Sequence, residues 1–490
     1  RPASAPSVSR PRDPPTRRPK AVNSHYRDAS LPIHERVQVL LEQMTLDEKL
    51  AQLGSTYVYE ILDGGELDPE RAANVMEHGI GHISRIGGAS ALEPHQVAKV
   101  ANAIQTDLLT RTRLGIPAFV HEECLAGVMG KGATVFPQGL GIAAPWDPDI
   151  SSASGRAIAR PMRAGGAHQG LAPVLAGGRD PRWGRVEETS GEDPYLVASM
   201  GVATIRGLQA NGNGGGVVAT AKHFAGHGAP EGGMNSAPPH VGPRELLEVY
   251  LAPFEAAVRV AGVGSFMHAY HEIDGIPCIA NRDLLVDTLR IHWGFDGTMV
   301  SDYNGVEELV ATHHLVPTLA EAAASSLEAG VDVELPNTVG YGKPLKTAVT
   351  LGRLDEALVD RSVSRVLHQK FKLGLFENPM VPASGLQPLA DDAALAQAAA
   401  EASFVLLRNE GAVLPLGDQV TSVAVIGPSA HDARLLLGDY SYAAALEAME
   451  EARLAGDVFS PAPTEPLSYL DLSAVPTLLD AVMKRAGDSV

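Results

Sequence analysis

Residues 294–305 read Gly-Phe-Asp-Gly-Thr-Met-Val-Ser-Asp-Tyr-Asn-Gly. The apolar run at residues 298–300 ends just before the carboxylate of Asp302, and a turn follows. A parallel strand brings a single acid in this way to the open end of an α/β barrel, where such folds carry their functional groups. Asp302 could instead cap the next helix. Asn304 and Glu307 predict a capping box of their own, however, which would leave the Asp302 side chain free.

Short apolar segments alternate with helical patterns on both sides of this stretch. Strands are expected at residues 82–86, 118–120, 171–175, 217–221, 265–268, 298–300 and 331–333. Helices are expected at residues 45–53, 94–110, 194–208, 243–260, 283–292, 319–329 and 355–371. About seven or eight successive β-α units indicate a parallel sheet closed into a TIM-like (β/α)8 barrel, rather than an open doubly wound sheet.

The chain divides into four parts by composition and pattern. Residues 1–30 are rich in Pro, Arg and Ser without apolar periodicity, which predicts a disordered tail. Residues 31–376 form the barrel domain, and residues 377–390 have the Pro-rich composition of a linker. Residues 391–490 begin a new pattern, so we expect a second domain there.

The second pattern starts with an Ala-rich helix at residues 392–403, followed by expected strands at 404–407 and 423–426. About a hundred residues are too few for a complete three-layer α/β domain. We therefore expect the N-terminal, incomplete part of an α/β sandwich. Gly427 follows the second strand, but the G-x-G-x-x-G spacing is missing, so nucleotide binding is not expected.

Composition excludes several classes of partner. The hydrophobic fraction of 45% and the charged fraction of 20% are typical of a soluble globular protein. The formal charge of −19 argues against nucleic acid and against an anionic membrane surface. No apolar run reaches the roughly 18 residues of a membrane span. Only two cysteines occur, Cys124 and Cys278, so a disulfide framework is not expected.

The basic start of the chain is not followed by the apolar segment of a signal peptide. This pattern favours a cytoplasmic protein over an exported one, although the chain does not begin with Met. No sequence signal indicates an oligomeric state.

Polar residues follow five successive expected strands. They are His121, Glu122 and Glu123; Arg179, Arg182 and Arg185; Lys222 and His223; Tyr270; and Asp302. Because the carboxyl ends of parallel strands meet at one end of a barrel, these side chains predict a single polar pocket. Arg182 and Arg185 could also pair with acidic residues close to them in sequence.

Simpler explanations apply to some of these residues. Glu122 and Glu123 could form a solvated strand end. His223 and His227 stand four residues apart, a spacing typical of zinc ligands, but the glycines around them break the helix that would align them. We therefore expect neither a metal site nor a cofactor.

A pocket of carboxylates, fixed cationic donors and an aromatic edge suits a neutral, polyhydroxylated ligand such as a small carbohydrate. Hydrolysis of a glycosidic bond needs two carboxyl groups, one to attack the anomeric carbon and one to protonate the leaving oxygen. They lie about 5–5.5 Å apart when configuration is retained. Asp302 is well placed for the attacking role.

These motifs resemble glycoside hydrolase family 3, the β-glucosidase and β-xylosidase family. The resemblance runs from Met44-Thr45-Leu46-Asp47-Glu48-Lys49 to Gly438-Asp439-Tyr440-Ser441-Tyr442 and includes Leu114-Gly115-Ile116-Pro117, His121-Glu122-Glu123-Cys124, Arg179-Asp180-Pro181-Arg182-Trp183-Gly184-Arg185, Gly191-Glu192-Asp193-Pro194-Tyr195, Lys222-His223-Phe224 and Ser301-Asp302-Tyr303.

The resemblance implies a retaining, exo-acting enzyme that removes terminal β-D-glucosyl or β-D-xylosyl residues. It implies that Asp302 is the nucleophile. The substrate-binding residues that it implies are Glu123, Arg185, Lys222, His223, Met267, Tyr270 and Tyr303.

Departures from the family pattern qualify this expectation. His268 stands where relatives often have Asn or Ser, and Ala126-Gly127 replaces a common His-Gly. The family's general acid/base is a Glu in the sandwich domain, and we expect it beyond residue 490. The alternative reading is therefore a sugar-binding, catalytically impaired fragment, which would cleave activated aryl glycosides weakly and natural disaccharides hardly at all.

Overall fold

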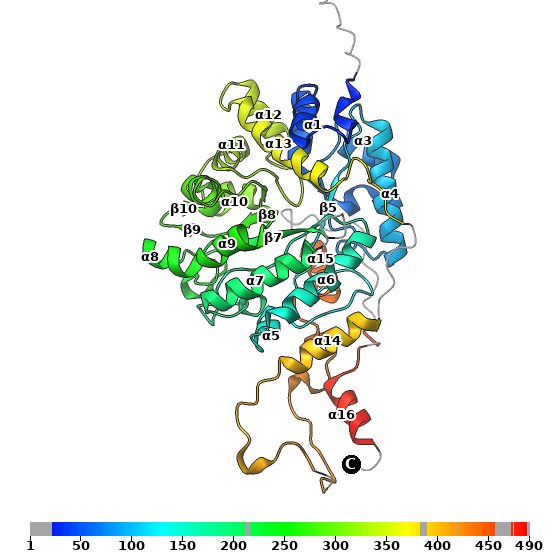
Figure 1. Cartoon of the computed structure of the whole chain (residues 1–490), viewed down its shortest axis with the longest axis vertical. Coiled ribbons are helices and arrows are strands. Elements are labelled where there is room, and N and C mark those ends of the chain that lie inside the picture. Colours follow the sequence, from blue (N-terminus) through cyan, green and yellow to red (C-terminus); the bar gives the residue numbers. More distant parts are fainter. Residues whose placement is uncertain are drawn as a thin grey trace, which may run out of the picture.

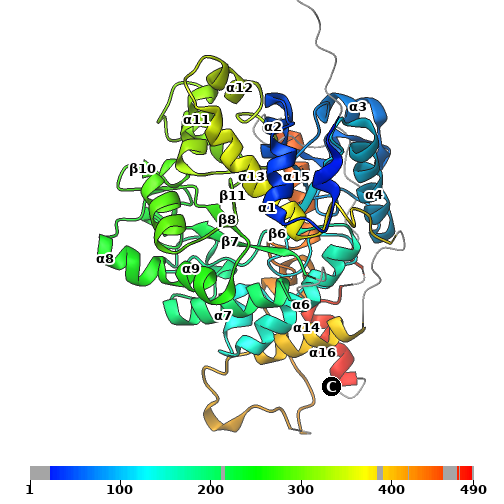
Figure 2. The ribbon, with the colours of Figure 1, turned by 45° about the horizontal axis from the view of Figure 1, so that its top comes forward.

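Seven parallel strands form the centre of the molecule, in the order β1-β4-β5-β6-β7-β8-β11. Figure 2 shows β6, β7, β8 and β11 of this sheet in the middle of the molecule. The computed structural model describes residues 22–210, 216–382, 390–417, 419–455, 472–473 and 475–487. The strands are β1 (Ser55–Tyr57), β4 (His82–Ser84), β5 (Phe119–Glu122), β6 (Gln169–Gly170), β7 (Val218–Phe224), β8 (Ser265–His268) and β11 (Thr298–Val300).

Residues 331–334 close this sheet into a barrel. Val333 forms a parallel bridge to Val300 at the end of β11. On the other side, the Glu334 amide donates to the Leu53 carbonyl at 2.9 Å, and the Ser55 hydroxyl donates to the Glu334 carbonyl at 2.7 Å. The predicted TIM-like α/β barrel is confirmed, with a short and irregular eighth position.

Within the barrel sheet, the first strand and the strand before Val174 also differ from the prediction. β1 was not expected, because Ser55-Thr56-Tyr57 contains no apolar run. The strand expected at 171–175 lies instead at 169–170, and only Val174 adds a further bridge, to Lys222.

Helices surround the barrel (Figure 1). Those of the first half are η1 (Ser24–Arg27), α1 (Ile33–Leu41), α2 (Leu46–Leu53), η2 (Val58–Glu60), α3 (Pro69–Val75), α4 (Pro94–Arg111), α5 (Gly139–Ala143), α6 (Pro148–Ala164), η3 (Val186–Glu188), α7 (Pro194–Leu208) and η4 (Glu231–Gly233). Those of the second half of the barrel are α8 (Pro243–Glu245), η5 (Leu246–Tyr250), α9 (Ala252–Ala256), η6 (Ala257–Ala261), η7 (Cys278–Ala280), η8 (Asp283–His292), α10 (Gly305–Ala311), α11 (Leu319–Ala329), α12 (Lys343–Thr350) and α13 (Glu356–Lys372). Two hairpins, β2 (Leu62–Asp63) with β3 (Glu66–Leu67) and β9 (Glu272–Ile273) with β10 (Ile276–Pro277), lie outside the barrel sheet.

Most predicted helices form at the predicted places. α2 begins with the predicted capping box, in which Thr45 and Glu48 each accept the other's backbone amide. The helix expected at 243–260 is divided into α8, η5, α9 and η6, with π-type turns in η5 and η6. Pro253 lies within this segment, and proline cannot donate the bond that regular α-helix requires.

Order begins earlier than the predicted boundary at residue 31. Residues 1–21 lie outside the described residues, but Tyr26 is 1% exposed, and its hydroxyl donates to the Leu114 carbonyl at 2.7 Å. Arg27 also donates to this carbonyl, at 3.1 Å. Residues 22–30 are therefore docked on the barrel rather than part of a tail.

Beyond the barrel, α14 (Ala390–Ala402) packs beside α6, with Arg160 of α6 paired to Asp392 (Figure 1). The strands predicted at 404–407 and 423–426 do not form, and Phe404 is 84% exposed. A strand needs a partner for its backbone groups, and neither segment has one among the described residues. The rest of this part comprises η9 (Glu410–Ala412), η10 (Pro428–His431), η11 (Arg434–Leu436), α15 (Tyr442–Ala455) and α16 (Leu478–Ala486).

α15 returns to the barrel. The Tyr442 hydroxyl donates to the Ser90 carbonyl at 3.2 Å, and Ala443 and Leu446 are buried. This contact holds residues 438–442 over the carboxyl ends of the strands. In the part of the chain that the structure describes, no helix is both long and apolar enough to cross a membrane.

Candidate active site

Asp302 lies at the carboxyl end of β11 and is 7% exposed. Its Oδ1 accepts hydrogen bonds from the Tyr270 hydroxyl and from the Tyr303 amide, each at 2.8 Å. The predicted capping box is wrong, because Asn304 has a left-handed φ of 61° and makes no side-chain cap. Asp302 is nevertheless free of capping, since its side chain bonds no amide of α10.

The second oxygen of this carboxylate differs from the first in its hydrogen bonding. Among the described residues, Asp302 Oδ2 is buried and has no hydrogen-bond partner. It lies 3.7 Å from His223 Nε2. Burial raises the pKa of Asp302 to about 6, against the opposing effects of Arg185 and Lys222. One oxygen is thus fixed by two donors, and the other is available to react.

Lys222 and Glu123 form a buried ion pair beside Asp302. Lys222 Nζ donates to Glu123 Oε2 at 2.8 Å, and the two side chains are 1% and 10% exposed. Burial alone would lower the pKa of Lys222, but the Glu123 carboxylate and Tyr440 raise it above its usual value. The Lys222 ammonium nitrogen lies over the Tyr440 ring, 5.0 Å from the ring centroid. Lys222 therefore stays charged inside the pocket.

Arg185 connects the remaining polar groups. It binds both oxygens of Glu188, at 2.5 and 2.9 Å, which confirms that this arginine pairs with an acid near it in sequence. Its Nη2 also donates to His223 Nε2 at 3.0 Å and to the Tyr440 hydroxyl at 3.3 Å. Burial and the Arg185 charge hold the pKa of His223 well below its usual value. Because Nε2 accepts, the proton of this neutral imidazole lies on Nδ1, which has no partner among the described residues.

Tyr303 and Met267 occupy different environments. The Tyr303 hydroxyl lies 3.1 Å from His121 Nε2, and its ring meets Tyr57 edge-on with centroids 6.2 Å apart. Tyr303 thus forms an aromatic wall next to the nucleophile candidate. Met267 is 1% exposed and belongs to the main hydrophobic core, so it supports the site from below.

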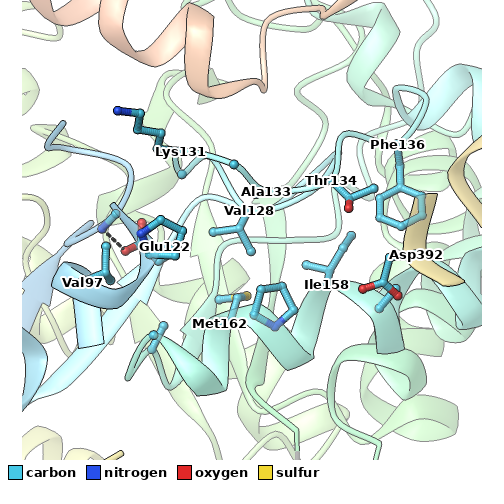
Figure 3. Close-up of a pocket in the computed structure, with 18 residues that line it drawn as sticks. Val97, Glu122, Val128, Lys131, Ala133, Thr134, Phe136, Ile158, Met162 and Asp392 are labelled. Atoms are coloured by element: carbon cyan, nitrogen blue, oxygen red, sulfur yellow. Dashed lines mark hydrogen bonds between the residues drawn. The ribbon is translucent and has the colours of Figure 1, made fainter. Parts of the chain in front are cut away.

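Glu122 does not face the polar pocket. Its oxygens accept from the amides of Gly87 and Gly88, at 2.7 and 3.1 Å, and burial raises its pKa to about 7. It lines a separate and largely apolar cavity with Val128 on one side and Met162 of α6 on another (Figure 3). The adjacent acids at 122 and 123 therefore have different roles, and neither is a solvated strand end.

Three neighbours of the pocket were not identified from the sequence. Glu188 orients Arg185, and Tyr440 covers Lys222. His268 accepts the Asp302 amide. Tyr440 lies in the Gly438-Asp439-Tyr440 motif, and this motif is the sequence signal that could have identified it. Within the described ranges, no group of three or more His, Cys, Asp or Glu side chains could hold a metal ion.

The molecule is therefore an α/β barrel whose strand ends carry a buried carboxylate beside Arg, Lys and His. Residues 45–369 match the sequence profile described as the glycosyl hydrolase family 3 N terminal domain. The chain belongs to glycosyl hydrolase family 3.

Individual relatives agree with this assignment. A putative beta-xylosidase of Formosa agariphila is 36% identical over 83% of this chain and 55% of that protein. The periplasmic beta-glucosidase of Salmonella typhimurium is 31% identical over 82% of this chain and 51% of its own length. The chain therefore spans about half the length of these relatives.

Solved structures show the same fold. A β-glucosidase from Erythrobacter marinus superimposes with a TM-score of 0.79 at 38% identity, covering 88% of this chain and 58% of that one. A β-glucosidase from Listeria innocua in complex with glucose gives a TM-score of 0.73 at 34% identity, covering 84% and 56%.

Proposed function

We propose that the protein is a retaining, exo-acting β-glycosidase that removes terminal non-reducing β-D-glucosyl or β-D-xylosyl residues. The observation that carries the proposal is the asymmetry of Asp302. Oδ1 is held by Tyr270 and Tyr303, while Oδ2 has no partner among the described residues and faces the pocket of charged side chains. A carboxylate held in this way attacks an anomeric carbon without first reorienting.

The other pocket residues serve as sugar contacts in this proposal. Lys222 and Arg185 donate to ring hydroxyls, and the Glu123 carboxylate accepts from them. His223 offers its Nδ1–H, since its Nε2 is taken by Arg185. Tyr303 supplies an apolar wall for a sugar ring. Such a set of donors and acceptors around one carboxylate selects a neutral sugar at the end of a chain.

The names of the relatives support both sugars. The two relatives described above are called a beta-xylosidase and a beta-glucosidase, and the Listeria innocua structure holds glucose. We therefore propose a β-glucoside or a β-xyloside as the substrate.

A second candidate is a chain that binds sugar but hydrolyses it poorly. Its supporting observation is that Glu123 is already paired with Lys222, and Glu188 with Arg185. Without a proton donor, a leaving group of high pKa departs about 10²–10⁴-fold more slowly. This candidate therefore predicts turnover only of activated aryl glycosides.

The decisive experiment is to trap the glycosyl-enzyme. The chain is incubated with 2,4-dinitrophenyl 2-deoxy-2-fluoro glucoside or xyloside, and the intact mass and the labelled peptide are measured. We expect one sugar per chain, attached to Asp302. The Asp302→Ala variant should take no label and should not hydrolyse dinitrophenyl glycosides.

A matched control is available in the same stretch of chain. Asp296 is exposed and precedes β11, so the Asp296→Ala variant should be labelled as fast as the wild type. Label on another residue, or equal turnover by Asp302→Ala, would refute the nucleophile assignment. Comparing dinitrophenyl glycosides with cellobiose and xylobiose separates the two candidate functions.

A further inference from the structure

His268 lies directly behind the nucleophile candidate, at the end of β8. Its imidazole is 1% exposed, and its Nε2 accepts the backbone amide of Asp302 at 3.1 Å. The sugar contacts proposed above do not include this histidine. It bonds the backbone of the reacting residue rather than its carboxylate.

The hydrogen bonds of His268 fix its tautomer. Nδ1 lies 2.9 Å from the Ala269 carbonyl, which only accepts, so Nδ1 carries the proton. Nε2 is therefore a permanent acceptor for the Asp302 amide. Burial lowers the pKa of His268 to about 4, so the ring is neutral at the pH at which proteins usually work.

The position of His268 extends the strand ladder by one bond. Pairing between β8 and β11 ends at Met267 and Val300. The amide of Ser301, the residue after β11, points away from β8 and donates to the Val333 carbonyl at 2.8 Å. The His268 side chain then accepts the Asp302 amide, as a backbone carbonyl of the partner strand would.

The His268 ring also packs closely against the backbone of Gly305. A Cβ atom on Gly305 would lie 2.7 Å from His268 Cε1 and 2.8 Å from Nε2, so the glycine at the start of α10 leaves room for the imidazole. Two residues further along the same loop, the single proton of the Tyr270 hydroxyl is shared between Asp302 Oδ1 and the Tyr303 carbonyl, at 2.8 and 3.1 Å. Residues 268–270 thus hold the turn at 302–303 at three points.

We infer that His268 is a positioning residue for the glycosylation step, which sets the place of Asp302 Oδ2 by holding the Asp302 amide. The inference rests on the proposed function of Asp302. Without an acceptor, the buried amide loses its partner, and the turn at 302–305 can shift toward another one. A displacement of about 1 Å at a reacting atom costs on the order of 10²-fold in rate.

The test compares three variants with the wild type. His268→Leu removes the acceptor, whereas His268→Gln places an amide oxygen at the distance of Nε2 from the backbone. His271→Leu is the matched control, because His271 is buried in the same loop, donates Nδ1–H to its neighbouring carbonyl and does not touch Asp302. The measurements are kcat and KM for dinitrophenyl glycosides, the rate of labelling by the fluorosugar and the pH profile.

For His268→Leu we expect kcat and the labelling rate to fall about 10–100-fold, with KM changed less than about threefold. His268→Gln should restore both rates to within about fivefold, and His271→Leu should stay within about twofold of the wild type. The acid limb of the pH profile should keep its position in all variants, since a neutral His268 does not exchange protons with the substrate. Loss of the acid limb of the pH profile in His268→Leu would overturn the positioning role in favour of proton transfer.

A second measurement is independent of turnover. Amide hydrogen exchange of a peptide covering residues 298–305 should be slow in the wild type and in His268→Gln, and fast in His268→Leu. If the wild type neither hydrolyses nor becomes labelled, the proposed function fails, and exchange alone decides the positioning role. Equal exchange in all variants, or full activity of His268→Leu, would overturn the inference.

Discussion

The Asp302→Asn substitution measures what it costs the protein to bury its nucleophile candidate. The carboxyl is 7% exposed, and burial raises its pKa from 3.8 to about 6 despite Arg185 and Lys222. The folded protein therefore binds this proton more tightly than the unfolded chain does. The protonated Asp302 carboxyl therefore contributes stability to the folded protein. This contribution is fully present below about pH 4 and is lost as the pH rises through about 6.

The magnitude follows from the size of the pKa shift. A rise from 3.8 to about 6, at 1.36 kcal/mol per unit, corresponds to about 3 kcal/mol of lost stability at pH 8. Asparagine keeps the oxygen that accepts from Tyr270 and Tyr303, but its NH2 group replaces Oδ2 and finds no partner, which costs about 1–2 kcal/mol. We therefore expect Asp302→Asn to be more stable than the wild type by about 1–2 kcal/mol at pH 8, and less stable by a similar amount at pH 4.

The assay is urea unfolding of both proteins, followed by circular dichroism at several pH values from 4 to 8. The quantity of interest is the difference in the free energy of unfolding between variant and wild type, because titrating groups that do not interact with Asp302 cancel in it. Glu308, whose pKa burial and the Asp302 charge raise to about 7, does not cancel and changes the difference in the same direction. This difference should change by about 3 kcal/mol across the range, with its midpoint between the unfolded and folded pKa values. A difference that stays constant with pH would refute the argument.

Three further predictions use the same reasoning. Tyr270→Phe removes a hydrogen bond that lowers the pKa of Asp302, so the acid limb of kcat/KM for an aryl glycoside should move up by as much as about 1 pH unit, as a pH-rate profile would reveal. The pKa of Asp332 is shifted in the opposite direction: burial alone would raise it, but Arg290 and Arg365 hold it below its usual value. Asp332→Asn should therefore lower the free energy of unfolding by about 3–5 kcal/mol in urea at pH 7, and by less near pH 3. Lys370 is fully buried and donates to Gln52 Oε1 at 2.6 Å, and burial holds its pKa well below its usual value. Lys370→Met removes the cost of the buried charge but leaves the Gln52 oxygen without its donor, which costs about 1–3 kcal/mol, so the stability of the variant relative to the wild type should fall from pH 7 toward pH 10 in thermal melts.

The barrel fold and the position of Asp302 at a strand end were predictable because both follow from local sequence patterns. Strands such as β8 and β11 appear as short apolar runs between helical stretches, and the acid follows its strand directly. The capping box at Asn304 failed because the pattern carries no information on backbone handedness, and this residue is left-handed. β1 is not predictable from its own three residues, because it gains its order from pairing with β4.

Non-local partners explain the remaining differences. The segment at 404–407 has the composition of a strand, but a strand exists only where another backbone pairs with it. Glu188 was one of several acids near Arg185 in sequence, and spacing alone does not say which one the guanidinium meets. The sequence marks His268 as a departure from the family pattern, but its bond to Asp302 depends on the turn between β11 and α10.

The contact between Arg185 and Tyr440 joins residues 255 positions apart and brings the segment beyond the barrel into the wall of the pocket around Asp302. Excising the barrel at residue 382 would therefore remove the aromatic ring above Lys222. For the proposed glycosidase, libraries aimed at new sugar preference gain by randomising residues 438–442 together with the strand ends, since both contribute to the same surface.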